Sequence, residues 1–130
     1  MADLPPLKVK IQIRCGGEIA LGPGKADLLD AILREGSISA AGRLLGMSYR
    51  RTWMLVDTMN RCWDRPLVET VAGGSKGGGA RLTDFGIAML GHYRALQRMA
   101  ASLAASEEWE AMRTGLREQP RTTQKDDAAG

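Results

Sequence analysis

The chain has 130 residues, of which 44% are hydrophobic and 25% are charged, and its formal net charge is +3. This composition is typical of one globular domain with a tail, and a domain of this size can bury a core without disulfides or metals. It contains no long apolar run for a membrane span and no signal peptide pattern at its start, so we expect a cytoplasmic protein with no membrane partner.

Cysteine and histidine are both rare. Cys15 and Cys62 lie far apart in the sequence without a C-x-x-C spacing. We therefore expect two free thiols in a reducing compartment, each packed as a small apolar residue. Because His92 is the single histidine, a metal-ligand cluster is not expected, and we predict no metal, no cofactor and no small-molecule site.

A strand and a helix are predicted first. Alternating apolar and polar residues over 7–13 predict a half-buried strand that ends at Gly16-Gly17, and 18–21 is either a returning strand or a linker. A helix follows over 25–35 and ends at Gly36, a residue that favours the left-handed cap. Its predicted apolar stripe comprises Leu28, Leu29, Ile32 and Leu33.

Two further helices are predicted around a tight turn. A short helix over 40–45 is capped by Ser37 or Ser39, since either hydroxyl can accept a free backbone N–H of the first turn, and Gly46 closes it. A third helix runs from about Tyr49 to Trp63, with Ser48 as its cap and Pro66 as its limit.

The remaining pattern is a hairpin and a long helix. Segments 67–71 and 80–82 predict two strands joined by the glycine-rich run 73–79. Thr83 then caps a helix from Asp84 to a point between 106 and 115. This order predicts a mainly α fold with a small β component, a winged helix-turn-helix with a long C-terminal dimerisation helix over 1–106 (or to about 115), followed by a disordered polar tail over 116–130.

The third helix has two distinct faces. At 100° per residue, the mostly large and apolar face should pack inward: it comprises Tyr49, Thr52, Trp53, Val56, Met59, Asn60 and Trp63. The opposite face carries Arg50, Arg51 and Arg61, together with Asp57, which we expect to pair with a neighbouring arginine. Positive charge also concentrates here, because the stretch from Arg43 to Arg81 holds seven basic and only three acidic residues.

Basic residues at the start of such a helix indicate a nucleic-acid partner. A major groove admits one α-helix, whose N-terminal residues contact base edges and phosphates. Arginine can bind guanine through two hydrogen bonds or clamp a phosphate, and Tyr49 suits either core packing or a DNA contact. The predicted contacts to double-stranded DNA are Ser39, Ser48, Tyr49, Arg50, Arg51, Arg61, Ser75, Lys76 and Arg81.

The glycine-rich run favours a wing over a nucleotide-binding loop. In a phosphate-cradling loop the lysine is followed by Ser or Thr and a helix opens at once, whereas Lys76 is followed by Gly77 and a second strand. Glycines would let the hairpin tip approach a DNA backbone, with Ser75 or Lys76 on phosphate. An exposed flexible turn is the alternative.

Six segments together match a known pattern: Gly36–Ala41, Met47–Trp53, Met59-Asn60, Pro66–Glu69, Gly73–Gly79 and Ala80–Thr83. They resemble the N-terminal DNA-binding domain of ModE, the molybdate-responsive transcription regulators, and more distantly the winged helix of LysR-type regulators. The resemblance covers roughly Leu7 to Leu103. It implies a homodimeric regulator with the third helix in the major groove and the wing on the backbone. The molybdate-binding C-terminal domains of ModE are expected to be absent.

The last helix offers a surface for that dimer. Tyr93, Leu96, Met99 and Leu103 keep the three-to-four spacing of a helix–helix seam, although packing onto their own domain is the alternative. We therefore predict a sequence-specific DNA-binding transcription regulator. The alternative is a winged helix used for protein interaction, and no enzyme is expected, because no nucleophile–base pair or cofactor loop is present.

Overall fold

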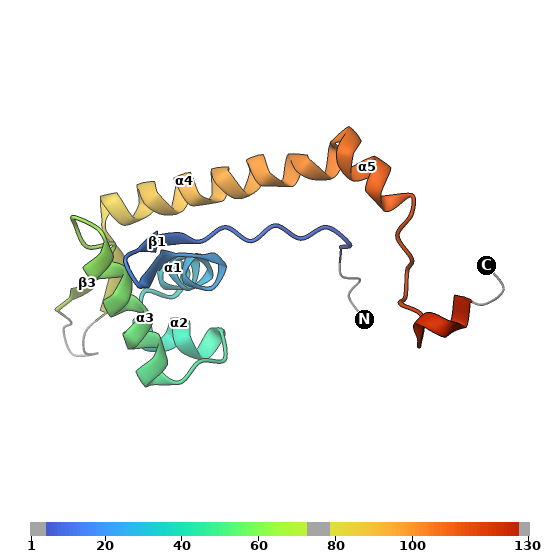
Figure 1. Cartoon of the computed structure of the whole chain (residues 1–130). Helices are drawn as coiled ribbons and strands as arrows, with labels where there is room; N and C mark the ends of the chain where they lie inside the picture. Colours follow the sequence, from blue (N-terminus) through green and yellow to red (C-terminus); the bar gives the residue numbers. More distant parts are fainter. Residues whose placement is uncertain (1–4, 73–78, 128–130) are drawn as a thin grey trace. The chain divides into compact units, whose positions relative to one another are not determined.

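The computed structural model describes residues 5–72 and 79–127, and the chain divides into two compact units, 1–100 and 101–130. The predicted order of elements is confirmed in the first unit (Figure 1). Its elements are β1 (Ile13–Cys15), β2 (Glu18–Leu21), α1 (Pro23–Glu35), α2 (Ile38–Leu44), α3 (Tyr49–Cys62), β3 (Val68–Val71), β4 (Gly79–Leu82) and α4 (Asp84–Ala101). The glycine-rich tip with Ser75 and Lys76 lies outside the described residues.

The first strand is shorter than its pattern predicts. Only Ile13–Cys15 pairs, antiparallel to β2, with a register shift between Ile13 and Arg14. The prediction of a strand over 7–12 is wrong, because this segment has no neighbouring strand among the described residues. It is nevertheless fixed at one point, since the Tyr93 hydroxyl donates a 2.8 Å hydrogen bond to the carbonyl of Ile11.

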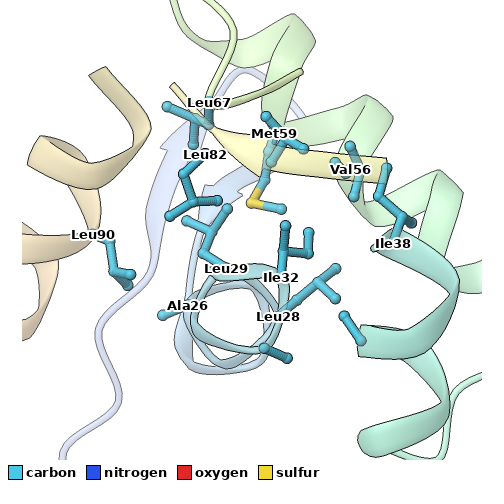
Figure 2. Close-up of a cluster of buried hydrophobic side chains, with 14 of the residues drawn as sticks. Ala26, Leu28, Leu29, Ile32, Ile38, Val56, Met59, Leu67, Leu82 and Leu90 are labelled. Carbon is cyan, nitrogen blue, oxygen red and sulfur yellow. The ribbon is translucent and has the colours of Figure 1, made fainter. Parts of the chain in front are cut away.

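Helix α1 forms the centre of the core. Pro23 opens it and Gly36, at φ 71°, ends it in the left-handed region, as predicted. Figure 2 shows side chains of α2, α3, β4 and α4 converging on α1. The buried residues of α1 are Ala26, Leu28, Leu29, Ala31 and Ile32, whereas Leu33 is exposed and was wrongly placed in the stripe.

Helices α2 and α3 pack closely around their turn. The Ser37 hydroxyl accepts from Ala40 N, and the Ser48 hydroxyl accepts from Arg51 N, each at 3.1 Å, so both predicted helix starts are capped. Gly42 permits this approach: a Cβ there would overlap Oγ1 of the fully buried Thr52 and lie 3.1 Å from its Cβ. The helix-turn-helix therefore requires glycine at position 42.

Asn60 fixes the start of the hairpin to α3. Its side-chain oxygen accepts from Leu67 N at 2.9 Å and Val68 N at 3.1 Å, and its amide nitrogen donates to the carbonyl of Val68 at 2.9 Å. Strands β3 and β4 then pair in register from Val68↔Leu82 to Val71↔Gly79. The amide therefore sets the position of the wing relative to the third helix.

Replacing Asn60 with alanine should destabilise the domain by about 1–3 kcal/mol, because two backbone N–H groups at partly buried positions lose their acceptor. The measurement is urea unfolding followed by circular dichroism. Thr58→Ala, two residues away on the same helix and partly exposed, is the control and should change stability by less than about 0.5 kcal/mol. Equal effects of the two changes would contradict the proposed clamp.

Two sets of contacts, one at the start of α4 and one near its middle, hold this helix on the rest of the unit. Thr83 caps it, as predicted, with its hydroxyl accepting from Gly86 N at 2.9 Å. Arg94 forms ion pairs with Asp27 at 2.9 Å and with Asp30, both on α1. These contacts seat α4 on the core.

The second unit corrects the prediction of one continuous last helix. Helix α4 ends at Ala101, and the unit contains a 3₁₀ turn η1 (Ser102–Ala105), helix α5 (Glu107–Arg113) and a 3₁₀ turn η2 (Gln124–Asp127). Ser106 explains the break: its backbone is extended, at ψ 152°, and its hydroxyl accepts from Trp109 N at 3.1 Å, which starts a new helix.

Candidate nucleic-acid interface

The N-terminus of α3 carries two exposed arginines. Arg50 and Arg51 form no ion pair with the described residues, and the first turn contains no acidic residue. Ser48 uses its hydroxyl oxygen to cap the helix and keeps its O–H free to donate. The charges of the two arginines and the positive end of the α3 dipole repel one another. An anion bound there would be attracted both by the arginines and by the dipole.

Tyr49 lies beside these arginines and points away from the core. Its side chain is 65% exposed, so core packing, one of the two alternatives for it, is excluded. Its ring meets Trp53 edge-on, with 6.1 Å between centroids. Trp53 and Trp63 are partly buried and pack against the core, as predicted, and the Trp63 indole donates to the carbonyl of Ala20 at 3.3 Å.

A hollow of about 560 Å³ lies between α2, α3 and the base of the hairpin. Trp53 lines this hollow with part of its ring, while its indole N–H is buried and has no hydrogen-bond acceptor in the described part of the chain. The hollow offers several hydroxyls to a ligand. It is lined by Ser37, Ile38, Ser39, Tyr49, Trp53, Thr70, Val71, Ala72, Gly79 and Ala80.

A second hollow, of about 290 Å³, lies on the other side of α3 and adds a cation that the sequence analysis missed. It brings Lys25, in the first turn of α1, next to Arg50, Arg51 and Ser48, with Glu18 also lining it. Partial burial lowers the pKa of Lys25, and the charge of Arg51 lowers it further. The sequence signal that could have revealed this residue is its position directly after the Gly-Pro-Gly sequence at the start of α1.

The other predicted arginines are paired. Arg61 binds Asp57 at 2.8 Å, as predicted for Asp57, and approaches Glu18 at 3.6 Å; the hydrogen bond to Asp57 raises its pKa. Arg81 binds Glu69 across the hairpin at 2.7 Å. Each would have to share or release its carboxylate to reach a phosphate. The structure therefore places Ser39 and Tyr49 at the first hollow and Ser48, Arg50 and Arg51 at the second, with Arg61 near the far end of α3.

The predicted dimer residues differ in their exposure to solvent. Leu96 and Met99 are 41% and 68% exposed on α4, and Leu103 in the second unit is 49% exposed. Tyr93 is only 2% exposed, so its assignment to a dimer surface is wrong. Its ring is buried in its own domain, and this burial raises the pKa of its hydroxyl. Among residues 5–72 and 79–127 no group of three potential metal ligands gathers, and no helix could span a membrane.

A short helix, a tight turn, a capped helix with free arginines and a β-hairpin define a winged helix-turn-helix domain. The DNA-binding domain of CbnR, solved in a complex with DNA, has the same fold: its TM-score is 0.52 at 19% identity, over 68% of this chain and 95% of that one. No family model matches the chain.

Curated relatives point to one group. The molybdenum transport protein ModE of Azotobacter vinelandii is 47% identical over 78 residues, 60% of this chain and 29% of that protein. The molybdenum-pterin-binding protein MopA of Rhodobacter capsulatus is 37% identical and the DNA-binding transcriptional dual regulator ModE of Escherichia coli K12 is 30% identical, each over 92 residues, 71% of this chain and 35% of the relative. The winged helix is thus ModE-like, as the sequence motifs predicted, and the chain spans about a third of the length of these relatives.

Proposed function

We propose that this chain binds duplex DNA through α3 and acts as a transcription regulator. The observation that carries the proposal is the pair of exposed arginines, Arg50 and Arg51, which lack carboxylate partners among the described residues at the capped start of a helix-turn-helix. The fold shared with a DNA-bound domain supports it, and so does the similarity to the DNA-binding transcriptional dual regulator of Escherichia coli.

The contacts follow from the geometry of the helix start. In the proposed complex, α3 enters the major groove with Arg50 and Arg51 leading, where a guanidinium can bind guanine O6 and N7 together or clamp a phosphate. Ser48 donates to a phosphate oxygen, and the positive end of α3 adds to the attraction. Lys25 extends the positive surface along the flank of α3.

The hollow beside Tyr49 takes the adjoining DNA backbone in this proposal. Ser39 and Tyr49 offer hydroxyls there that can donate to phosphate oxygens. On the hairpin side we propose that Ser75, Lys76 and Arg81 contact phosphates. These contacts would fix the register of the protein on the duplex and carry no base sequence by themselves.

Salt dependence of binding tests the proposal. DNA fragments selected from a random pool by the purified chain should bind in a fluorescence anisotropy titration, and log K should fall linearly with log salt concentration, with a slope of about −0.9 for each neutralised phosphate. A scrambled duplex of equal length is the control and should bind at least about 10³-fold more weakly. Failure to select any sequence, with salt-independent weak binding, would refute it and favour the protein-interaction alternative.

We also propose that α4 pairs two copies of the chain. Its exposed apolar residues Leu96 and Met99, three residues apart, give it a surface suited to a helix–helix seam, and two-fold pairing would present two α3 helices to one duplex.

Leu96→Glu should therefore weaken dimerisation by at least tenfold in sedimentation equilibrium, because burying an unpaired carboxylate at the seam is unfavourable. Arg98→Glu, exposed on another face of the same helix, is the control and should leave the association constant within about threefold of wild type. A wild-type chain that remains monomeric at 100 times the protein concentration needed for DNA binding would contradict the pairing.

A further inference from the structure

The fold brings the two cysteines of the chain together. Cys15 is the last residue of β1 and Cys62 is the last residue of α3, and both are free thiols. Their side chains lie close enough to interact with one another. The sequence analysis expected two separate thiols packed as small apolar residues, but Cys15 is exposed and Cys62 only half-buried.

Independent contacts hold the two elements side by side. Gly16, at φ 57°, allows a two-residue turn that pairs Cys15 with Glu18. Glu18 reaches Arg61, the neighbour of Cys62, at 3.6 Å. In Figure 1 the β1–β2 hairpin accordingly lies against α3. The thiols thus meet through backbone elements that are fixed on both sides.

The surroundings of the pair differ for the two sulfurs. Burial raises the pKa of Cys62, with the neighbouring Cys15 adding to the effect, whereas the charge of Arg61 opposes it. Lys25 also lies close enough to interact electrostatically with Cys62. An exposed thiol beside a more shielded one is an arrangement that favours attack by the first and resolution by the second.

We propose that Cys15 and Cys62 form an intramolecular disulfide when the protein meets a peroxide. The Cys15 thiolate attacks one oxygen of hydrogen peroxide, the O–O bond breaks, and the departing hydroxide takes up a proton to leave as water, so that Cys15 becomes a sulfenic acid. The Cys62 thiolate then attacks that sulfur and displaces hydroxide, which leaves as a second water after protonation. Peroxide is thereby reduced by two electrons and the two thiols are oxidised by two.

The bond would close a loop that contains α1, α2 and α3. Because Arg50 and Arg51 lie at the opposite end of α3 from Cys62, the disulfide leaves the proposed DNA contacts in place and restrains the unfolded chain. The oxidised protein is therefore expected to unfold at a higher temperature than the reduced one. This inference rests on the fold and not on the proposed function.

The experiment treats the full chain with hydrogen peroxide and measures its intact mass and free thiols. The expected result is loss of two hydrogens and of both thiols together, a monomeric band on a non-reducing gel, a peptide joining Cys15 to Cys62, and recovery of both thiols with dithiothreitol. Cys15→Ser and Cys62→Ser are the controls, and each should gain oxygen or form covalent dimers. The same treatment in denaturing urea should form the bond at least tenfold more slowly.

Two results would overturn the inference. One is wild-type protein that accumulates sulfinic acid or covalent dimers at the rate of the single-serine variants. The other is formation of the bond equally fast in urea, since the folded contact would then contribute nothing. Neither result depends on whether the chain binds DNA.

Discussion

Alanine at both Arg50 and Arg51 should abolish specific DNA binding, and each single change should weaken it by about 1–3 kcal/mol, roughly five- to 150-fold, if the side chain contacts a base. The reason is that both guanidinium groups are exposed and without carboxylate partners among the described residues, so their whole charge is available to DNA. Anisotropy titration against the selected sequence and its scrambled control measures the loss. A base contact reduces affinity for the first only, whereas a phosphate contact reduces both.

Arg61→Ala is the matched control for this prediction. It removes the same charge from the same helix, but Asp57 already compensates that charge, so the affinity should change by less than about 1 kcal/mol. Circular dichroism should show that all four variants remain folded. If Arg61→Ala weakens binding as much as Arg50→Ala, the duplex lies along the whole exposed face of α3 and the proposed docking by its N-terminus is wrong.

Local chemistry explains why most of the fold could be predicted. Gly36 could be recognised as a helix end because only glycine adopts φ 71° without strain, and Ser48 and Thr83 could be recognised as caps because their hydroxyls satisfy backbone N–H groups within three residues. Such signals act over one turn. They located both ends of α1, α2 and α3, and the start of α4, to within two residues.

Features that depend on distant partners could not be predicted. Residues 7–12 alternate like a strand, yet a strand forms only where another pairs with it, and here the segment is held by Tyr93 from far along the chain. The Tyr93 ring is buried in its own domain and is therefore not available to a dimer surface. Periodicity cannot distinguish a helix face that packs on its own domain from one that packs on a partner.

The residues of the candidate site also differ in whether local sequence could reveal them. Arg50 and Arg51 were identifiable because both follow a capping serine, but the pairing of Arg61 with Glu18 and of Arg81 with Glu69 joins separate elements. Lys25 and the pair Cys15–Cys62 likewise meet their neighbours only through the packing of α1 and the β1–β2 hairpin against α3. Spacing in the sequence carries no signal for these contacts.

Replacing Gly86 with alanine should be among the most damaging single-methyl changes in the domain. The start of α4 lies so close to Leu67, the residue before β3, that a Cβ at position 86 would overlap the carbonyl oxygen of Leu67 and lie 2.9 Å from its carbonyl carbon. That carbonyl cannot easily move, because it accepts from Thr83 N at 2.9 Å. We expect a loss of about 2–3 kcal/mol and a fall in Tm of about 10–20 °C.

Gly91→Ala, five residues further along α4 at an exposed position, provides the opposite expectation. A Cβ there meets nothing within 4 Å, so alanine should stabilise α4 by about 0.5–1 kcal/mol through its higher helix propensity. Thermal unfolding of both variants at one low protein concentration separates packing from propensity, since the chemical change is identical. Equal shifts in Tm would mean that α4 is not seated against the start of β3, and the placement of the hairpin relative to α3 would then have to be revised.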